Sequence, residues 1–260
     1  MKFFFWQKPR SWQKYTAYSI VGLVLIGVFI VYSVLSEDEK AVEKAWSTKN
    51  STQSATTSEV TLSVEESMQQ LLEGNKRYIE QKLAGKEINQ EYRQVLKEEG
   101  QKPFAVIVGC SDSRVPPELI FDQAFGDLFV VRVAGNVIDA VAMASVEYAV
   151  EQLHSPLVVV LGHESCGAVK AAVDNCCDAI DNPNDSNMNK LLSLIQPSVQ
   201  EVKKEATQDA PLYEAVTDKN VAIMVEKIKQ NPQLSTLINQ GKLSIVGAKY
   251  HLESGEVDFF

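Results

Sequence analysis

Short apolar runs alternate along this chain with segments whose apolar residues recur at helical spacing. The β-branched or aromatic runs Phe104–Val108, Leu128–Val133, Leu157–Leu161 and Leu243–Lys249 predict strands. Helical patterns such as Val141–Gln152 lie between them. Because buried strands that alternate with helices are typical of parallel sheets, the pattern predicts an α/β domain with a mainly parallel sheet flanked by helices.

This domain is expected to begin near residue 63 and to continue to residue 260. Ser63, with Glu66 three residues later, forms a candidate capping box for a helix from about Val64 to Gln81. Apolar residues recur within it at helical spacing, at Met68, Leu71, Leu72 and Ile79.

A longer apolar segment precedes the domain. The 19 residues Ala17–Leu35 carry no charge, and at ~1.5 Å per helical residue they nearly cross a hydrocarbon core of roughly 30 Å. Aromatic residues flank or edge this span, at Trp6, Trp12, Tyr15, Tyr18 and Tyr32. The pattern predicts one transmembrane helix over residues 15–36, since no polar face is present. A cleaved signal peptide is the alternative, although SVLSEDEK lacks a small-x-small cleavage site.

Charge around the span predicts its orientation. Residues 1–14 contain four basic residues and no acidic one, whereas Glu37, Asp38 and Glu39 follow the span. The positive-inside rule therefore places residues 1–14 in the cytoplasm and the domain in the periplasm or outside the cell. Residues 37–62 are a linker, whose polar, low-complexity part at residues 48–58 is typical of a flexible tether.

The charge of the remaining chain argues against nucleic acid as a partner. Without the four basic residues that precede the span, 21 basic and 34 acidic residues remain, a formal net charge of −13. Such a domain repels phosphate backbones, and it contains no basic stripe. Residues 174–189 are acidic and rich in turn formers, but they lack the register of an EF-hand, so we expect a solvated loop.

Three candidate metal ligands follow two of the predicted strands. Cys110 ends one apolar run, and His163 and Cys166 follow another, 53 residues later. Two thiolates and one imidazole suit a tetrahedral zinc with an open fourth position, as in catalytic rather than structural zinc sites. The carboxyl ends of parallel strands are where open α/β sheets bind ligands. The sequence therefore predicts one zinc ion per chain.

Asp112 and Arg114 follow Cys110 within the pentapeptide CSDSR. Residues two apart on a turn can point the same way, so the Arg114 guanidinium can hold the Asp112 carboxylate ionised through a fork of hydrogen bonds. An ionised carboxylate beside the metal can accept a proton and orient a nucleophile. A structural ion pair at the end of a strand is the alternative interpretation.

The motifs CSDSR and GHESCGAV, with VPPELIFDQAFGDLFVVRVAGNV and SVEYAV between them, resemble the β-class carbonic anhydrase family from about Ser63 to the C-terminus. The resemblance implies reversible hydration of CO₂ to bicarbonate and a proton, by attack of a zinc-bound hydroxide assisted by Asp112 and Arg114. It also implies a second state in which Asp112 itself ligates zinc beside Cys110, His163 and Cys166.

The resemblance further implies five substrate-binding positions, Gln101, Phe129, Ala134, Tyr148 and Gly167. Gln101 falls where the family has a glutamine that donates to a substrate oxygen. Phe129, Ala134 and Tyr148 match a hydrophobic lining, and Gly167 matches a close-packed glycine. Gln101, Phe129 and Tyr148 are expected to reach the zinc of a neighbouring subunit, so activity would require a homodimer or a higher homo-oligomer. Taken without the family, Phe129 and Tyr148 are typical core aromatics.

Two other functions stay open. A hydrolase of CS₂ or COS could use the same fold and zinc, and a non-enzymatic protein could bind inorganic carbon beside a membrane transporter. Asp112 and Arg114 argue against the binding protein, since a structural zinc needs no dyad beside an open position.

The remaining histidines and cysteines have two interpretations each. His154 could shuttle protons, or it could have only a structural or surface role, as is expected of His251. Cys176 and Cys177 could pair between subunits or have no role, and a disulfide between these adjacent residues would be strained.

Overall fold

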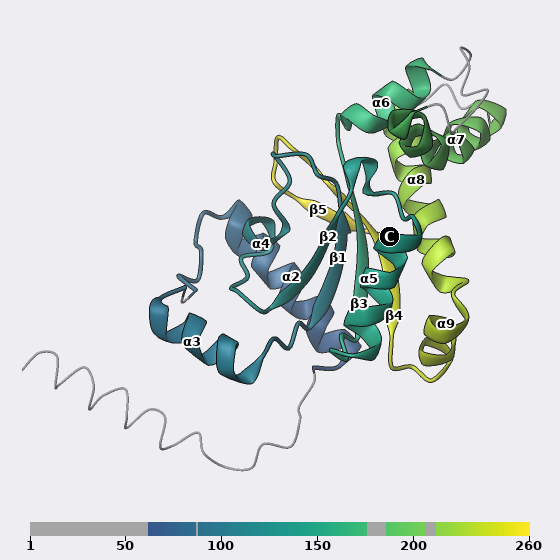
Figure 1. Cartoon of the computed structure of the whole chain (residues 1–260). Coiled ribbons are helices and arrows are strands. Elements are labelled where there is room, and N and C mark those ends of the chain that lie inside the picture. The colour runs from purple at the N-terminus through teal and green to yellow at the C-terminus, as the bar shows by residue number, and fades with distance from the viewer. Residues whose placement is uncertain (1–61, 87, 176–185, 206–211) are drawn as a thin grey trace, which may run out of the picture. The chain divides into compact units, whose positions relative to one another are not determined.

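A computed structural model describes residues 62–86, 88–175, 186–205 and 212–260, which belong to one compact unit (Figure 1). The predicted span over residues 15–36, the linker up to residue 61, Cys176 and Cys177 lie outside these residues. None of the helices within the described ranges is long and apolar enough to cross a membrane.

The unit is built on a five-stranded sheet with the strand order β2-β1-β3-β4-β5. Its strands are β1 (Ala105–Gly109), β2 (Leu128–Arg132), β3 (Leu157–His163), β4 (Ser244–Tyr250) and β5 (Val257–Phe259). The first four are parallel to their neighbours, and β5 pairs antiparallel with β4. The prediction of a mainly parallel sheet is confirmed, and the four predicted strands lie within two residues of the observed ones. The three residues of β5 carry no pattern that would have predicted a strand.

Helices cover both faces of this sheet. They are α2 (Val64–Ile79), α3 (Gln90–Glu99), α4 (Pro117–Ile120), α5 (Ala140–Glu151), α6 (Gly167–Asp174), α7 (Asn187–Glu205), α8 (Leu212–Lys229) and α9 (Pro232–Asn239), with a 3₁₀ turn η1 at Ala134–Asn136. Figure 1 shows α2 and α4 on one side of the sheet and α5, α8 and α9 on the other.

Alternate side chains of the central strands pack into two separate cores. Val106, Val108 and Val158 pack with α5 to α9 on one face, whereas Ile107 and Val159 pack with α2 and α4 on the other. A strand that is buried on both faces needs apolar residues at every position. This is why β1 and β3 appear in the sequence as continuous apolar runs.

The predicted capping box begins α2. The Ser63 hydroxyl accepts a hydrogen bond from the Glu66 N–H at 3.1 Å, and the Glu66 carboxylate accepts one from the Ser63 N–H at 2.8 Å. The helix ends at Ile79, two residues before the predicted end. Of the apolar positions, Leu71 is fully buried, but Leu72 and Ile79 are 44% and 38% exposed.

The register of the sheet brings the metal-ligand motifs together. Gly109, the last residue of β1, is aligned with Leu161 of β3, so Cys110 leaves the sheet beside the end of β3, where His163 lies. Two motifs that are 53 residues apart in sequence therefore meet at the carboxyl edge of the sheet.

Candidate metal centre

Cys110, His163 and Cys166 form a three-residue cluster at this edge. Their candidate ligand atoms all lie within 4.8 Å of one another, and all three residues are buried. Cys110 follows β1, His163 is the last residue of β3, and Cys166 caps the N-terminus of α6. The fold thus brings the three predicted ligands together, although no local sequence pattern connects the two motifs.

Backbone N–H groups surround the Cys110 sulfur. Gly135 donates to Sγ at 3.2 Å and Asp112 at 3.4 Å. Gly135 has a φ of 69°, and a Cβ there would lie 2.8 Å from Cδ1 of Ile195, so only glycine fits. A hydrogen bond from Cys166, together with contacts from His163 and these N–H groups, lowers the pKa of Cys110 to about 4.

The second sulfur indicates that a cation belongs in this cluster. The hydrogen bond between Cys166 and Cys110, and burial, raise the pKa of Cys166, although the N–H groups of Val169 and Ala168 at the start of α6 oppose this rise. One thiolate thus forms readily, whereas a second one beside it is disfavoured without positive charge. A metal ion supplies that charge.

The orientation of His163 also suits metal binding. His163 Nδ1 lies 2.8 Å from the Glu164 carbonyl oxygen, and because a carbonyl only accepts, Nδ1 carries the hydrogen. The other nitrogen, Nε2, is buried and has no hydrogen-bond partner. A lone pair on Nε2 beside two sulfurs is the donor set that zinc prefers. The residues therefore fit the predicted ion.

Asp112 and Arg114 form the predicted fork. Arg114 Nε donates to Oδ1 at 2.9 Å and its terminal nitrogen to Oδ2 at 2.8 Å, and the Arg114 N–H also reaches Oδ1 at 2.9 Å. These bonds from Arg114 hold the pKa of Asp112 well below its usual range. Both carboxylate oxygens are engaged by Arg114, and Asp112 is not part of the metal cluster. The state in which Asp112 ligates zinc stays a prediction.

Arg132, at the end of β2, was missed by the sequence reasoning. Its guanidinium donates to the carbonyl oxygens of Cys110 at 2.9 Å and Asp112 at 2.6 Å, and so holds the turn that carries both residues. The sequence predicted β2 but did not place it beside β1, so it offered no reason to connect Arg132 with this turn.

The five predicted substrate-binding residues lie in different places. Ala134 is in η1 directly before Gly135, and Gly167 directly follows Cys166. A Cβ on Gly167 would meet no atom within 4 Å, so the close packing expected there is wrong within this chain. Gln101 is exposed and precedes β1, at the opposite end of that strand from Cys110.

Phe129 and Tyr148 contact each other, and Phe129 is partly buried against the core on the α5 side of the sheet. Their ring centroids lie 6.1 Å apart, on β2 and α5. Tyr148 is 50% exposed, so its interpretation as a core aromatic is wrong. The pair borders the outer strand of the sheet.

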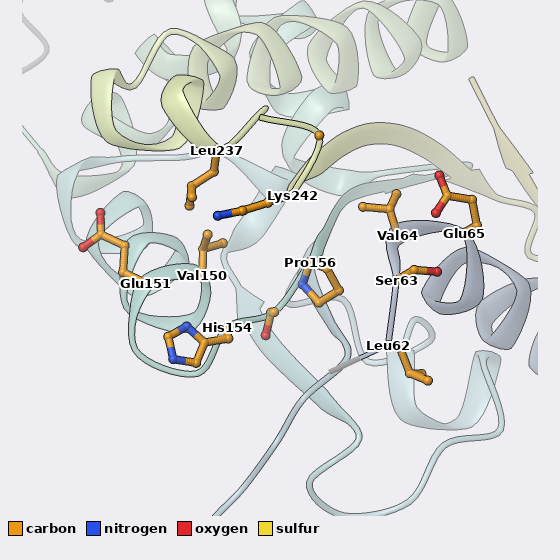
Figure 2. Close-up of a pocket in the computed structure, with 12 residues that line it drawn as sticks. Leu62, Ser63, Val64, Glu65, Val150, Glu151, His154, Pro156, Leu237 and Lys242 are labelled. Carbon is orange, nitrogen blue, oxygen red and sulfur yellow. The ribbon is translucent and has the colours of Figure 1, made fainter. Parts of the chain in front are cut away.

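An open pocket of about 610 Å³ lies at the other end of the sheet (Figure 2). Its lining includes Ser63, His154, Pro156 and Lys242. His154 precedes β3 and His163 ends it, so the strand separates them by roughly 20 Å. Direct proton transfer between His154 and the metal cluster of the same chain is therefore excluded, and a surface role remains for this histidine.

A carbonic anhydrase family model matches residues 105–257, which include the cluster and the fork. The chain belongs to the carbonic anhydrase family. Carbonic anhydrase 2 of Mycobacterium tuberculosis is 40% identical over 186 residues, which cover 71% of this chain and 87% of that relative.

Solved carbonic anhydrases share the fold. The β-carbonic anhydrase CcaA has a TM-score of 0.57 at 27% identity, over 74% of this chain and 87% of CcaA. Tetrameric β-carbonic anhydrases from Sordaria macrospora reach a TM-score of 0.58 at 24% identity, over 75% of this chain and 97% of theirs, and show the fold alone. The prediction of a zinc-dependent enzyme of the β-carbonic anhydrase family is confirmed at the level of family, fold and donor set.

Proposed function

We propose that the chain catalyses the reversible hydration of CO₂ to bicarbonate and a proton at the cluster of Cys110, His163 and Cys166. The observation that carries this proposal is the ionised Asp112 held by Arg114 next to the cluster. No further His, Cys, Asp or Glu of the described residues joins the three ligands, and a tetrahedral zinc held by these three residues would have its fourth position available for water.

Zinc, when bound by these three residues, is a Lewis acid that makes water acidic enough to serve as a nucleophile. Asp112 then accepts a hydrogen bond from the nucleophile and directs its lone pair toward the carbon of CO₂. Arg114 keeps this carboxylate ionised and fixes its direction, and Arg132 fixes the backbone turn beneath it.

Stopped-flow CO₂ hydration by the full-length chain, with zinc content measured on the same sample, tests this function. We expect fast hydration at one zinc per chain, with a rate that rises with pH. Parallel assays on CS₂ and COS distinguish the alternative hydrolase, which would turn over these substrates and not CO₂. If zinc-loaded protein is inactive on all three substrates, non-enzymatic binding of inorganic carbon is the function that remains.

We also propose that the enzyme is a homodimer or a higher homo-oligomer. Among the described residues, β2 is an outer strand of the sheet. Tyr148 of α5, which contacts Phe129 of β2, is 50% exposed, and Val141 of the same helix is 74% exposed. Gln101 lies too far from Cys110 to reach the metal of its own chain, so a substrate role for it requires a neighbouring subunit. The Sordaria macrospora relatives are tetrameric, which agrees with this proposal.

We further propose that residues 15–36 anchor the chain in a membrane, with residues 1–14 in the cytoplasm and the catalytic domain on the outer side. The support is the uncharged stretch at residues 17–35, its aromatic flanks and the basic residues before it. CO₂ crosses membranes without a carrier, so an enzyme at this place meets its substrate directly.

A further inference from the structure

The loop between His163 and Cys166 has a backbone that needs support. Ser165 has a φ of 54°, in the left-handed region that residues other than glycine seldom adopt. This conformation costs on the order of 1 kcal/mol and persists only where surrounding contacts hold it. Since the loop connects two metal ligands, these contacts also decide where the ligands lie.

Glu164 connects this loop to the end of β4 and the residues that follow it. Its N–H donates to the Tyr250 carbonyl at 3.1 Å. Its carboxylate accepts from Nδ1 of His251 at 2.8 Å and from the Leu252 N–H at 3.0 Å. The side chain and the backbone of Glu164 are therefore both attached to the same neighbouring segment.

His251 extends this attachment to β5. Its second nitrogen, Nε2, lies 2.9 Å from Oδ2 of Asp258. A protonated imidazole donates to both carboxylates at once, and its hydrogen bond to Glu164 is the main reason that the pKa of His251 is raised. Glu164, His251 and Asp258 thus form a hydrogen-bonded chain from the metal loop to the edge of the sheet.

The same Glu164 controls the orientation of a metal ligand. Its carbonyl oxygen accepts the hydrogen of His163 Nδ1, which leaves Nε2 for the metal. A displacement of the Glu164 peptide would move this acceptor and release the imidazole ring. The carboxylate, one residue away from the ligand, therefore acts on the ligand through the backbone.

We propose that Glu164 is a positioning residue of the metal centre, which through His251 and Asp258 fixes the ring orientation and the tautomer of His163. This inference rests on the metal site of the proposed function and does not depend on the substrate.

A second carboxylate limits the effect of losing Glu164. Glu214 of α8 accepts the Ser165 N–H at 3.1 Å and forms an ion pair with Lys249 of β4 at 2.9 Å. The loop is thus held from two sides. Removing Glu164 is expected to loosen His163 without unfolding the loop.

The test compares Glu164→Ala, Glu164→Gln and Asp258→Asn with the unchanged chain. Zinc affinity is measured by competition with a chelating indicator, and the absorption spectrum of the cobalt(II)-substituted protein reports ligand geometry. We expect Glu164→Ala to weaken zinc binding by about 10- to 100-fold and to alter the cobalt bands. Glu164→Gln should lose less, because its amide oxygen still accepts from Leu252, and Asp258→Asn should change both readouts least. The control is Glu226→Gln, which removes an exposed partner of Lys229 and should change neither.

Wild-type zinc affinity and an unchanged cobalt spectrum in Glu164→Ala would overturn the proposal, because a merely structural role would lower only the thermal stability of the metal-free protein. If Glu164→Ala does not fold, Glu164→Gln and Asp258→Asn provide the test. Wild-type zinc affinity and a wild-type cobalt spectrum in both variants would then overturn the proposal. If the wild-type chain binds zinc but does not hydrate CO₂, the proposed function is refuted. The comparison of zinc affinities and cobalt spectra still tests the role of Glu164 in that case.

Discussion

The chemistry of the centre depends on charges fixed over very short sequence distances. Asp112 and Arg114 are two residues apart, and three hydrogen bonds from Arg114 keep this carboxylate ionised. The Asp112 side chain is only 18% exposed, so water competes weakly for these bonds. A carboxylate that is ionised before substrate arrives needs no rearrangement during the reaction.

Replacing Asp112 with asparagine should separate catalysis from metal binding. Asp112→Asn removes the negative charge and retains the shape, so kcat/KM for CO₂ hydration should fall by about 10²- to 10⁴-fold while zinc content stays the same. Asp174→Asn is the control, because it removes another ion-paired carboxylate, the partner of Lys170 on the surface of α6. Unchanged hydration by zinc-loaded Asp112→Asn would show that the assigned role is wrong.

His251 should make stability depend on pH. Its pKa is raised from the ordinary value of 6.5 by Glu164 and then by Asp258, so its charged form is favoured in the folded protein. The stabilisation is therefore fully present below about pH 6.5 and is lost as pH rises through the raised pKa. Thermal unfolding should show His251→Gln less stable than the unchanged chain at pH 6, with a smaller difference at pH 8.

The control for this comparison is His154→Gln, which removes an exposed histidine at the opposite end of β3. An equal loss of stability at both pH values in His251→Gln would mean that His251 stabilises the fold without its charge.

At the scale of elements, two parallel strands end next to each other, and in both of them a glycine directly precedes the metal ligand. Gly109 ends β1 before Cys110, and Gly162 precedes His163 in β3. Their surroundings differ, because α8 packs directly on Gly162. A Cβ on Gly162 would lie 2.6 Å from Cγ2 of Val221, whereas one on Gly109 would meet nothing nearer than 3.9 Å.

We expect the two glycines to respond differently to alanine. Gly162→Ala should force β3 and α8 apart and lower the free energy of unfolding by about 1–3 kcal/mol, with weaker zinc binding as His163 moves. Gly109→Ala is the matched control and should retain both properties. Chemical denaturation and zinc competition measure them, and equal effects of the two substitutions would contradict the packing argument.

At the scale of the whole molecule, the proposed active site extends beyond one chain. Ala134 lies close to the ligands in this structure, but Gln101, Phe129 and Tyr148 lie at the amino end or the outer edge of the sheet. Their predicted roles need a second subunit at the β2 edge.

Introducing a charge on the exposed side of α5, the helix whose Tyr148 contacts β2, tests the need for a second subunit. Val141→Asp should dissociate the oligomer, because a buried unpaired carboxylate is costly, and should reduce CO₂ hydration while zinc stays bound. Light scattering coupled to gel filtration measures the mass. Met188→Asp, at another exposed apolar position, is the control. A fully active monomer would contradict the proposed oligomer.

The proposed membrane topology has its own test. A reporter enzyme that is active only outside the cytoplasm, fused after Phe260, should be active, and a cytoplasmic reporter at the same position should be silent. The reverse result would overturn the orientation. Mass spectrometry of the purified chain distinguishes an anchor from a cleaved signal peptide, because only the anchor retains residues 1–36.

The sequence by itself determined the four parallel strands, the three metal ligands and the Asp112–Arg114 fork. The reason is physical: a strand buried on both faces must be apolar at every position, and ligands that follow parallel strands share one edge. The fork joins residues two apart, so its geometry is also local.

Only the tertiary structure decided which distant residues hold the two ligand-bearing segments in place. Arg132, Glu214 and His251 lie on different elements, and their partners are fixed by the order and register of the strands rather than by any pattern near them. Strand order also joined β5 to the sheet. A hydrogen bond between residues 87 apart, such as Glu164 with His251, depends on how the whole chain packs, and no local propensity encodes it.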